Sequence, residues 1–260
     1  ERLPLRVVEA NLVFDEADGD PVLACALTDV AIAQQAYSFE IKATGGPDGY
    51  AAFYLPEGLE LDLYQDKAYV GLLPFQMKHV RPRRTVPIPG ISYFPEFNLR
   101  TYVKYQGQGG NMFLTLEAQS RIACWYGHRS YGLPYRYARG SVQVVGDQYR
   151  WQTRRVSDGL ELIGSCQASG QPTEAQPRSL EEFLFERYRL YTIHDEQLKM
   201  VRAIHEPWRF RCAEATIVSN SLFDSYQLGI SDVLQPDLVH ATDGVKALTW
   251  SIEPVSVATA

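Results

Sequence analysis

The chain has 260 residues, a formal net charge of −6, 45% hydrophobic residues and 16 tyrosines. This length suffices for one large domain or two small ones, and the hydrophobic share is ordinary for a folded protein. The negative charge argues against a nucleic-acid partner, because phosphate binding usually needs a basic surface. The sequence has no run of about 18 apolar residues, so we expect no membrane-spanning helix and no membrane partner.

The N-terminal 50 residues contain short apolar pieces separated by turn-forming stretches at 16–20 (EADGD) and 44–49 (TGGPDG). Such spacing is typical of β-hairpins. The pattern leaves two alternatives open. These strands either extend the main sheet or form a small annex to it.

Most of the remaining chain is predicted to form strands. Mixed β-branched, aromatic and polar residues indicate strands at 67–80, 93–106, 112–118, 161–169, 198–205 and 245–252. A further segment, 141–156, reads as two strands joined by a tight Gly146–Asp147 turn.

Two segments are predicted to be helices. The first covers 119–132 and ends at Gly132, a residue suited to the C-terminal cap. The second covers 179–192, where Ser179 and Glu182 have the spacing of a capping box. Many strands and few helices favour an α+β, mainly β fold. We expect a curved, closed antiparallel sheet with helices packed outside, in a single domain spanning 1–260.

The four cysteines are widely spaced and form no Cys-x-x-Cys pair, which leaves a zinc or redox motif unsupported. A reduced, cytoplasmic protein is the simplest interpretation. His194 and His205 each stand next to an acidic residue, but neighbours in a strand face opposite ways and do not chelate one ion together. We therefore expect neither a metal site nor a cofactor.

The strand at 93–106 has one mostly apolar face and one polar face. Because alternate residues share a face, the polar side carries Glu96, Asn98, Arg100 and Tyr102. On an open sheet this face would be solvated. In a closed barrel it could line the interior, where Glu96 and Arg100 would need each other or a ligand.

Four motifs follow one another along the chain. They are LPEGLELDLYQDKAYVGLLPFQM (55–77), PIPGISYFPEFNLRTYV (87–103), SLEEFLFERYRLY (179–191) and HEPW (205–208). In this order they closely resemble the uncharacterised bacterial DUF2071 (YqjF-like) family. The likeness runs from about residue 53 to 253, whereas residues 1–52 depart from the family pattern. It implies relatedness to the acetoacetate decarboxylase-like superfamily, whose members form a closed antiparallel sheet around a cavity.

The resemblance also indicates a site. The decarboxylase keeps a Schiff-base lysine and a second lysine in a Tyr-Gly-Tyr-Pro-Lys-Lys stretch after a helix. This chain has YGLPYR (131–136) in the corresponding place, with Tyr135 and Arg136 where the lysines would be. Glu96 would be the counterpart of an active-site acid. A phenol forms no imine and arginine stays protonated, so imine-based decarboxylation is not expected.

Three functions remain open. In the first, a central cavity binds a small anionic or carbonyl ligand. Arg100 or Arg136 would anchor it, and the other residues facing it would be Glu96, Asn98, Tyr102, Tyr131 and Tyr135. In the second, the protein is a non-imine lyase, hydratase or isomerase, with Glu96 as acid or base and Tyr135 with Arg136 stabilising an enolate.

In the third, the protein is a structural or interaction domain in which Glu96 and Arg100 form an internal strut. Two chains could also pair as a homo-oligomer, through the LPYRY loop (133–137) or an edge strand.

Overall fold

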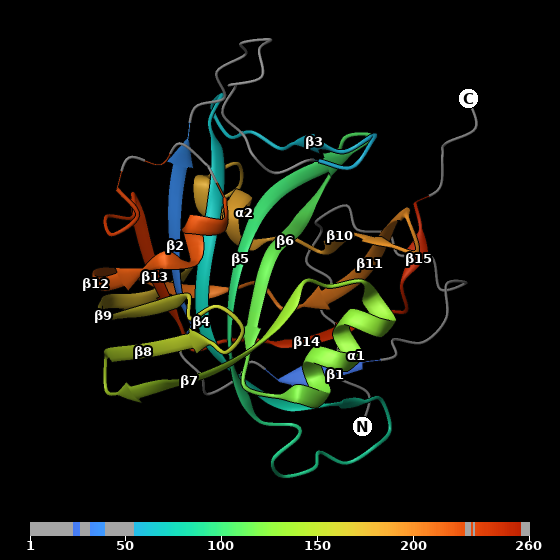
Figure 1. Ribbon diagram of the computed structural model, residues 1–260. Helices are drawn as coiled ribbons and strands as arrows, with labels where there is room; N and C mark the ends of the chain where they lie inside the picture. Colours follow the sequence, from blue (N-terminus) through green and yellow to red (C-terminus); the bar gives the residue numbers. More distant parts are fainter. Residues whose placement is uncertain (1–22, 27–31, 40–54, 227–229, 231, 256–260) are drawn as a thin grey trace.

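The computed structural model describes residues 23–26, 32–39, 55–226, 230 and 232–255. The turns expected at 16–20 and 44–49 lie outside the described residues. Within the described residues, fifteen strands form one hydrogen-bonded sheet, and the strand pairings close two rings. The two rings share three long strands in the middle of the molecule (Figure 1).

The larger ring contains nine strands, each hydrogen-bonded to the next. In ring order they are β2 (Ile32–Phe39), β4 (Ala68–Pro82), β5 (Phe94–Tyr105), β6 (Gln108–Ala118), β7 (Tyr135–Val145), β8 (Gln148–Arg155), β9 (Glu161–Glu174), β12 (Arg209–Asn220) and β13 (Leu238–Thr242). The ring closes where β13 pairs with β2. The closed, mainly β fold expected from the sequence is therefore confirmed.

A smaller ring closes on the other side of β4, β5 and β6. It adds four strands, which are β10 (Arg189–His194), β11 (Gln197–His205), β14 (Lys246–Thr249) and β1 (Leu23–Ala26). β6 pairs with β10, and the path returns through β11, β14 and β1 to β4. Figure 1 shows these four strands and the remainder of the larger ring on opposite sides of the shared strands. Two short strands, β3 (Glu60–Leu61) and β15 (Glu253–Pro254), pair with β5 and β11.

Two of the shared strands change partners along their length, which is how one sheet makes two rings. β4 pairs with β2 through residues 68–72 and with β1 through residues 78–82. β6 pairs with β10 near Asn111 and with β7 near Glu117, both in parallel. The sheet is thus mixed rather than wholly antiparallel. A helix connects β6 to β7, and such a crossover returns the chain in the same direction.

That connecting helix, α1 (Arg121–Tyr131), lies where the sequence predicts it. The Ser120 side chain accepts a hydrogen bond from the Ala123 backbone N–H at the N-terminus. Gly132 ends the helix in the left-handed conformation, with φ of 64°, and donates to the last carbonyls. Three residues, 132–134, therefore separate the end of α1 from the start of β7.

The second helix, α2 (Leu180–Phe185), is shorter than the predicted 179–192. Ser179 caps it as expected, by accepting a hydrogen bond from Glu182 N–H. Residues 189–194 instead form β10, which gains β6 and β11 as sheet neighbours. Those neighbours satisfy the backbone groups that a longer helix would have paired internally.

The N-terminal strands belong to the main sheet, which decides between the two alternatives left open by the sequence. β2 pairs with both β4 and β13, and β1 pairs with both β4 and β14. Each therefore completes one ring. The structure also contains strands that the sequence did not predict, namely β3, β10, β12, β13 and β15, and a short 3₁₀ helix, η2 (Ser221–Ser225).

Apolar residues of the shared strands point into the larger ring and form the main core. Val70, Leu72, Phe97 and Leu99 are buried there with Trp151 of β8. The opposite face of the same strands is covered by α2, whose Leu184 and Phe185 form a second cluster with Tyr102. Both faces of β5 are consequently removed from water.

Candidate functional site

The polar side chains of β5 lie on the face that looks away from the main core, toward the smaller ring. Glu96, Asn98 and Arg100 stand opposite Phe75, Leu73 and Gly71 of β4. Glu96 is 3% exposed, Asn98 4% and Tyr102 0%. The polar face of this strand is therefore buried, and not solvated as it would be on an open sheet.

Apolar residues lie directly beside this polar strip, which consists of Glu96, Asn98, Arg100 and Tyr102. Leu73 and Phe75 of β4 pack with Trp208, which follows β11. A few polar groups beside an apolar and aromatic wall are typical of small-molecule sites.

Glu96 accepts a hydrogen bond from the Tyr135 hydroxyl, with 2.9 Å between the oxygens. The parallel pairing of β6 and β7 sets Tyr135 beside Leu116, on the Glu96 side of the sheet. Burial raises the pKa of Glu96 to about 7, although the Tyr135 hydrogen bond acts in the opposite direction. The carboxyl group therefore changes protonation near neutral pH.

The ring of Tyr135 lies against α1 at Gly127. A methyl group at that position would collide with the Tyr135 ring atoms Cδ2 and Cε2. Glycine thus lets the helix pass directly over the tyrosine whose hydroxyl reaches Glu96.

Arg100 is held from two sides. Its Nη2 donates to the Leu184 carbonyl of α2 over 3.1 Å, and its guanidinium stands 5.6 Å from the Tyr102 ring centre. Glu96 and Arg100, both described residues, form no ion pair with each other. The internal strut considered from the sequence is therefore not formed.

His205 also lies in this region, although it was considered from the sequence only as a metal ligand. Its ring stacks on Tyr188, with centroids 4.6 Å apart, and lies 5.5 Å from Trp208. Burial lowers its pKa, and the positive charge of Arg100 acts in the same direction. A neutral imidazole therefore stands near the guanidinium.

Arg136 and Tyr131, the two remaining predicted site residues, have other surroundings than the Glu96–Tyr135 hydrogen bond. Arg136 is exposed and pairs in register with Glu117, so it projects from the other face of β7 than Tyr135 does. The joint stabilisation of an enolate by Tyr135 and Arg136 is incompatible with this arrangement. Tyr131 is buried at the end of α1 beside Tyr126, and burial raises its pKa to about 12.

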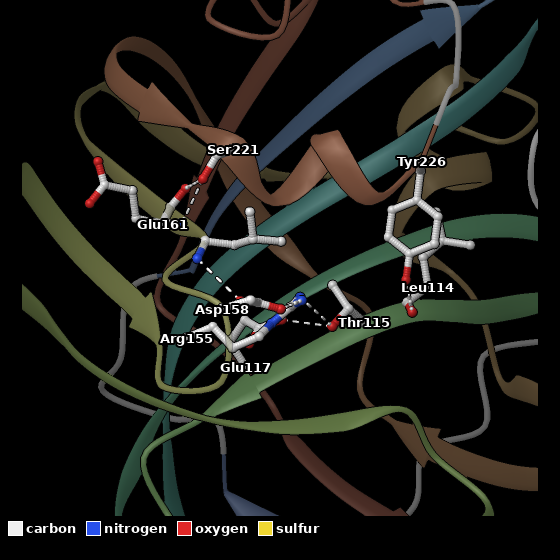
Figure 2. Close-up of polar contacts among 9 residues, drawn as sticks. Leu114, Thr115, Glu117, Arg155, Asp158, Glu161, Ser221 and Tyr226 are labelled. Atoms are coloured by element: carbon white, nitrogen blue, oxygen red, sulfur yellow. Dashed lines mark hydrogen bonds and ion pairs between the residues drawn. The ribbon is translucent and has the colours of Figure 1, made fainter.

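A second buried polar cluster was missed from the sequence. Figure 2 shows Arg155 of β8 bound to Glu117 and Thr115 of β6 and to Asp158. Arg155 Nε and Nη2 donate to the two Glu117 oxygens over 3.0 and 2.7 Å. Glu117 stands opposite Phe97, so the pair lies on the larger-ring face of the sheet. We call Thr115, Glu117, Arg155 and Asp158 the buried ion-pair network.

No group of three or more His, Cys, Asp or Glu side chains able to hold a metal ion occurs within the described residues. None of the helices in that part of the chain has the length and apolar character needed to cross a membrane.

Residues 50–246 match the model of DUF2071, described as an uncharacterized conserved protein family. The chain belongs to the DUF2071 family. The uncharacterized protein YqjF of Bacillus subtilis (strain 168) is 35% identical over 199 residues, which cover 76% of this chain and 81% of YqjF. The family resemblance inferred from the four motifs is confirmed.

Solved structures show which fold this DUF2071 member has. Acetoacetate decarboxylase from Legionella pneumophila superposes with a TM-score of 0.61 at 14% identity, covering 97% of this chain and all of that one. The enduracididine biosynthesis enzyme MppR, complexed with pyruvate, gives 0.56 at 14% identity and covers 92% of this chain and 91% of its own. The acetoacetate decarboxylase-like fold is therefore confirmed. At these identities the likeness extends to the fold alone.

Proposed function

We propose that the smaller ring of this DUF2071 protein binds a small organic molecule with a carboxylate or carbonyl group. The observation that carries the proposal is the polar strip of β5, buried beside an apolar wall. Arg100 supplies the positive charge, and Glu96 with Tyr135 supplies hydrogen bonds. A structural relative, MppR, is complexed with pyruvate, which is a molecule of this class.

Imine chemistry is not part of this proposal. The resemblance aligns Tyr135 with the Schiff-base lysine of acetoacetate decarboxylase, and a phenol cannot condense with a ketone. Treatment with borohydride in the presence of acetoacetate tests this point. We expect no covalent adduct by mass spectrometry, and an adduct on any lysine would refute the assignment.

Binding is tested by thermal denaturation with a panel of pyruvate, acetoacetate and short aliphatic acids. A ligand at 100 times its Kd stabilises the folded state by about 2.7 kcal/mol. For a chain of this size that corresponds to a rise in Tm of roughly 5–10 °C. The Arg100→Gln variant should lose the rise. Arg136→Gln removes an exposed arginine from the other face and should retain it. A panel without any stabilising acid, or loss only in Arg136→Gln, would contradict the proposal.

A second candidate function follows from the pKa of Glu96 near 7. A carboxyl group that titrates near neutral pH suits a general acid or base in a lyase, hydratase or isomerase. If a stabilising acid is also converted to a product, Glu96→Gln should abolish turnover while binding persists. Undiminished turnover in that variant would remove Glu96 from the role.

A further inference from the structure

Three buried polar atoms on the smaller-ring face of the shared strands have no hydrogen-bond partner among the described residues. They are Asn98 Oδ1, Arg100 Nε and Asn111 Oδ1. Asn98 is 4% exposed and Asn111 8% exposed. Asn111 of β6 stands opposite Tyr102, so it shares the face of the polar strip.

Leaving such groups unpaired is costly. A buried donor or acceptor without a partner destabilises a protein by about 1–3 kcal/mol, and most are paired in native structures. A bound molecule that reaches this face would supply the missing partners. Whether each atom donates or accepts a hydrogen bond limits which molecules can supply these partners. The arginine nitrogen donates a hydrogen bond, and the two amide oxygens accept one.

The order of these side chains along the strand determines which of them one small molecule can reach at the same time. Asn98 and Arg100 are two residues apart on one face, a backbone spacing of about 7 Å. Asn111 flanks Arg100 on the side away from Asn98, because it pairs with Tyr102. A single small molecule can thus place an acceptor at Arg100 and a donor at Asn98.

We propose that the ligand of the smaller ring is a small carboxylic acid that also carries a hydroxyl or ammonium donor. Its carboxylate accepts from Arg100, and its donor group reaches Asn98 Oδ1. This inference rests on the proposed function and adds the requirement for a donor. It separates hydroxy and amino acids, which fit, from keto acids and plain fatty acids, which leave the amide oxygen unpaired.

Three four-carbon acids test the requirement, because they differ only at the third carbon. That carbon bears a hydroxyl in 3-hydroxybutyrate, a keto oxygen in acetoacetate and only hydrogen in butyrate. Calorimetric titration of the full chain at pH 7 should show 3-hydroxybutyrate binding at least about tenfold more tightly than the other two.

Asn98→Leu should abolish that preference while leaving butyrate binding in place. Asn98→Asp offers only acceptor oxygens and should keep the preference, so it serves if the leucine variant does not fold. Tighter binding of acetoacetate, or equal binding of all three acids, would overturn the donor requirement and leave the binding function standing. If none of these acids and none of the broader panel binds, both proposals fail.

Discussion

The buried ion-pair network offers the sharpest test of the physical reasoning, through the single change Glu117→Gln. The Glu117 side chain is 0% exposed and that of Arg155 is 6% exposed. Burial disfavours the Arg155 charge, but the hydrogen bonds and charges of Glu117 and Asp158 outweigh it and raise the arginine pKa. Glutamine keeps the shape of Glu117 and removes its charge, which leaves Arg155 buried with only Asp158 as a countercharge.

Breaking a buried pair from one side costs about 3–5 kcal/mol. We expect the lower end, about 3 kcal/mol, because Asp158 still binds Arg155 Nη1 over 3.0 Å. For a chain of this size the loss corresponds to a fall in Tm of roughly 6–12 °C. Urea denaturation measures the free energy of unfolding directly, and the midpoint should fall without a change in slope.

Two further variants complete this test. Asp158→Asn removes a partner whose side chain is 45% exposed, so it should cost less than about 1 kcal/mol. Glu117→Gln combined with Arg155→Met removes both buried charges and should recover part of the loss. A cost below about 1 kcal/mol for Glu117→Gln, or a double variant less stable than the single one, would refute the reasoning.

Three other predictions concern Glu96 and the tyrosine above it. Because burial raises the pKa of Glu96 from 4.5 to about 7, its protonated form stabilises the fold. Stability from this group, about 3 kcal/mol, is full below pH 4.5 and lost as the pH rises through 7. Glu96→Gln should lack that slope in urea denaturation, and identical slopes would contradict the assignment. Tyr135→Phe removes a hydrogen bond to the carboxylate, so the Glu96 pKa, followed by carboxyl NMR, should rise further. Gly127→Ala should displace the Tyr135 ring and raise the Glu96 pKa. An unchanged Glu96 titration would show that α1 moves to accommodate the methyl group and leaves the hydrogen bond intact.

Local signals in the sequence predicted local structure well. The Ser179 cap and the Gly132 helix end depend on contacts within three or four residues, and both are present. The alternating polarity of 93–106 likewise predicted which side chains share a face of β5. These features need no knowledge of distant parts of the chain.

Features set by distant pairings were missed. Residues 189–192 fit a helical pattern, and only β6 and β11 make them a strand. Glu117 and Arg155 are 38 residues apart, and their contact requires β6, β7 and β8 to pair side by side. Arg136 was grouped with Tyr135 because the family resemblance places both residues where the decarboxylase keeps its two lysines. Since β7 begins at Tyr135, alternation separates the two side chains.

The strands shared by the two rings leave the protein little freedom to change their length. A single residue inserted into β5 would exchange its two faces. Glu96, Asn98 and Arg100 would then turn toward the apolar core, while Phe97 and Leu99 would replace them in the smaller ring. In a protein whose sheet has one solvated face, the displaced side chains could be exposed to water. Both faces of β5 are buried, so they could not be exposed here. Insertions and deletions in DUF2071 proteins should therefore gather in connections such as residues 83–93, and spare the strands on either side of them.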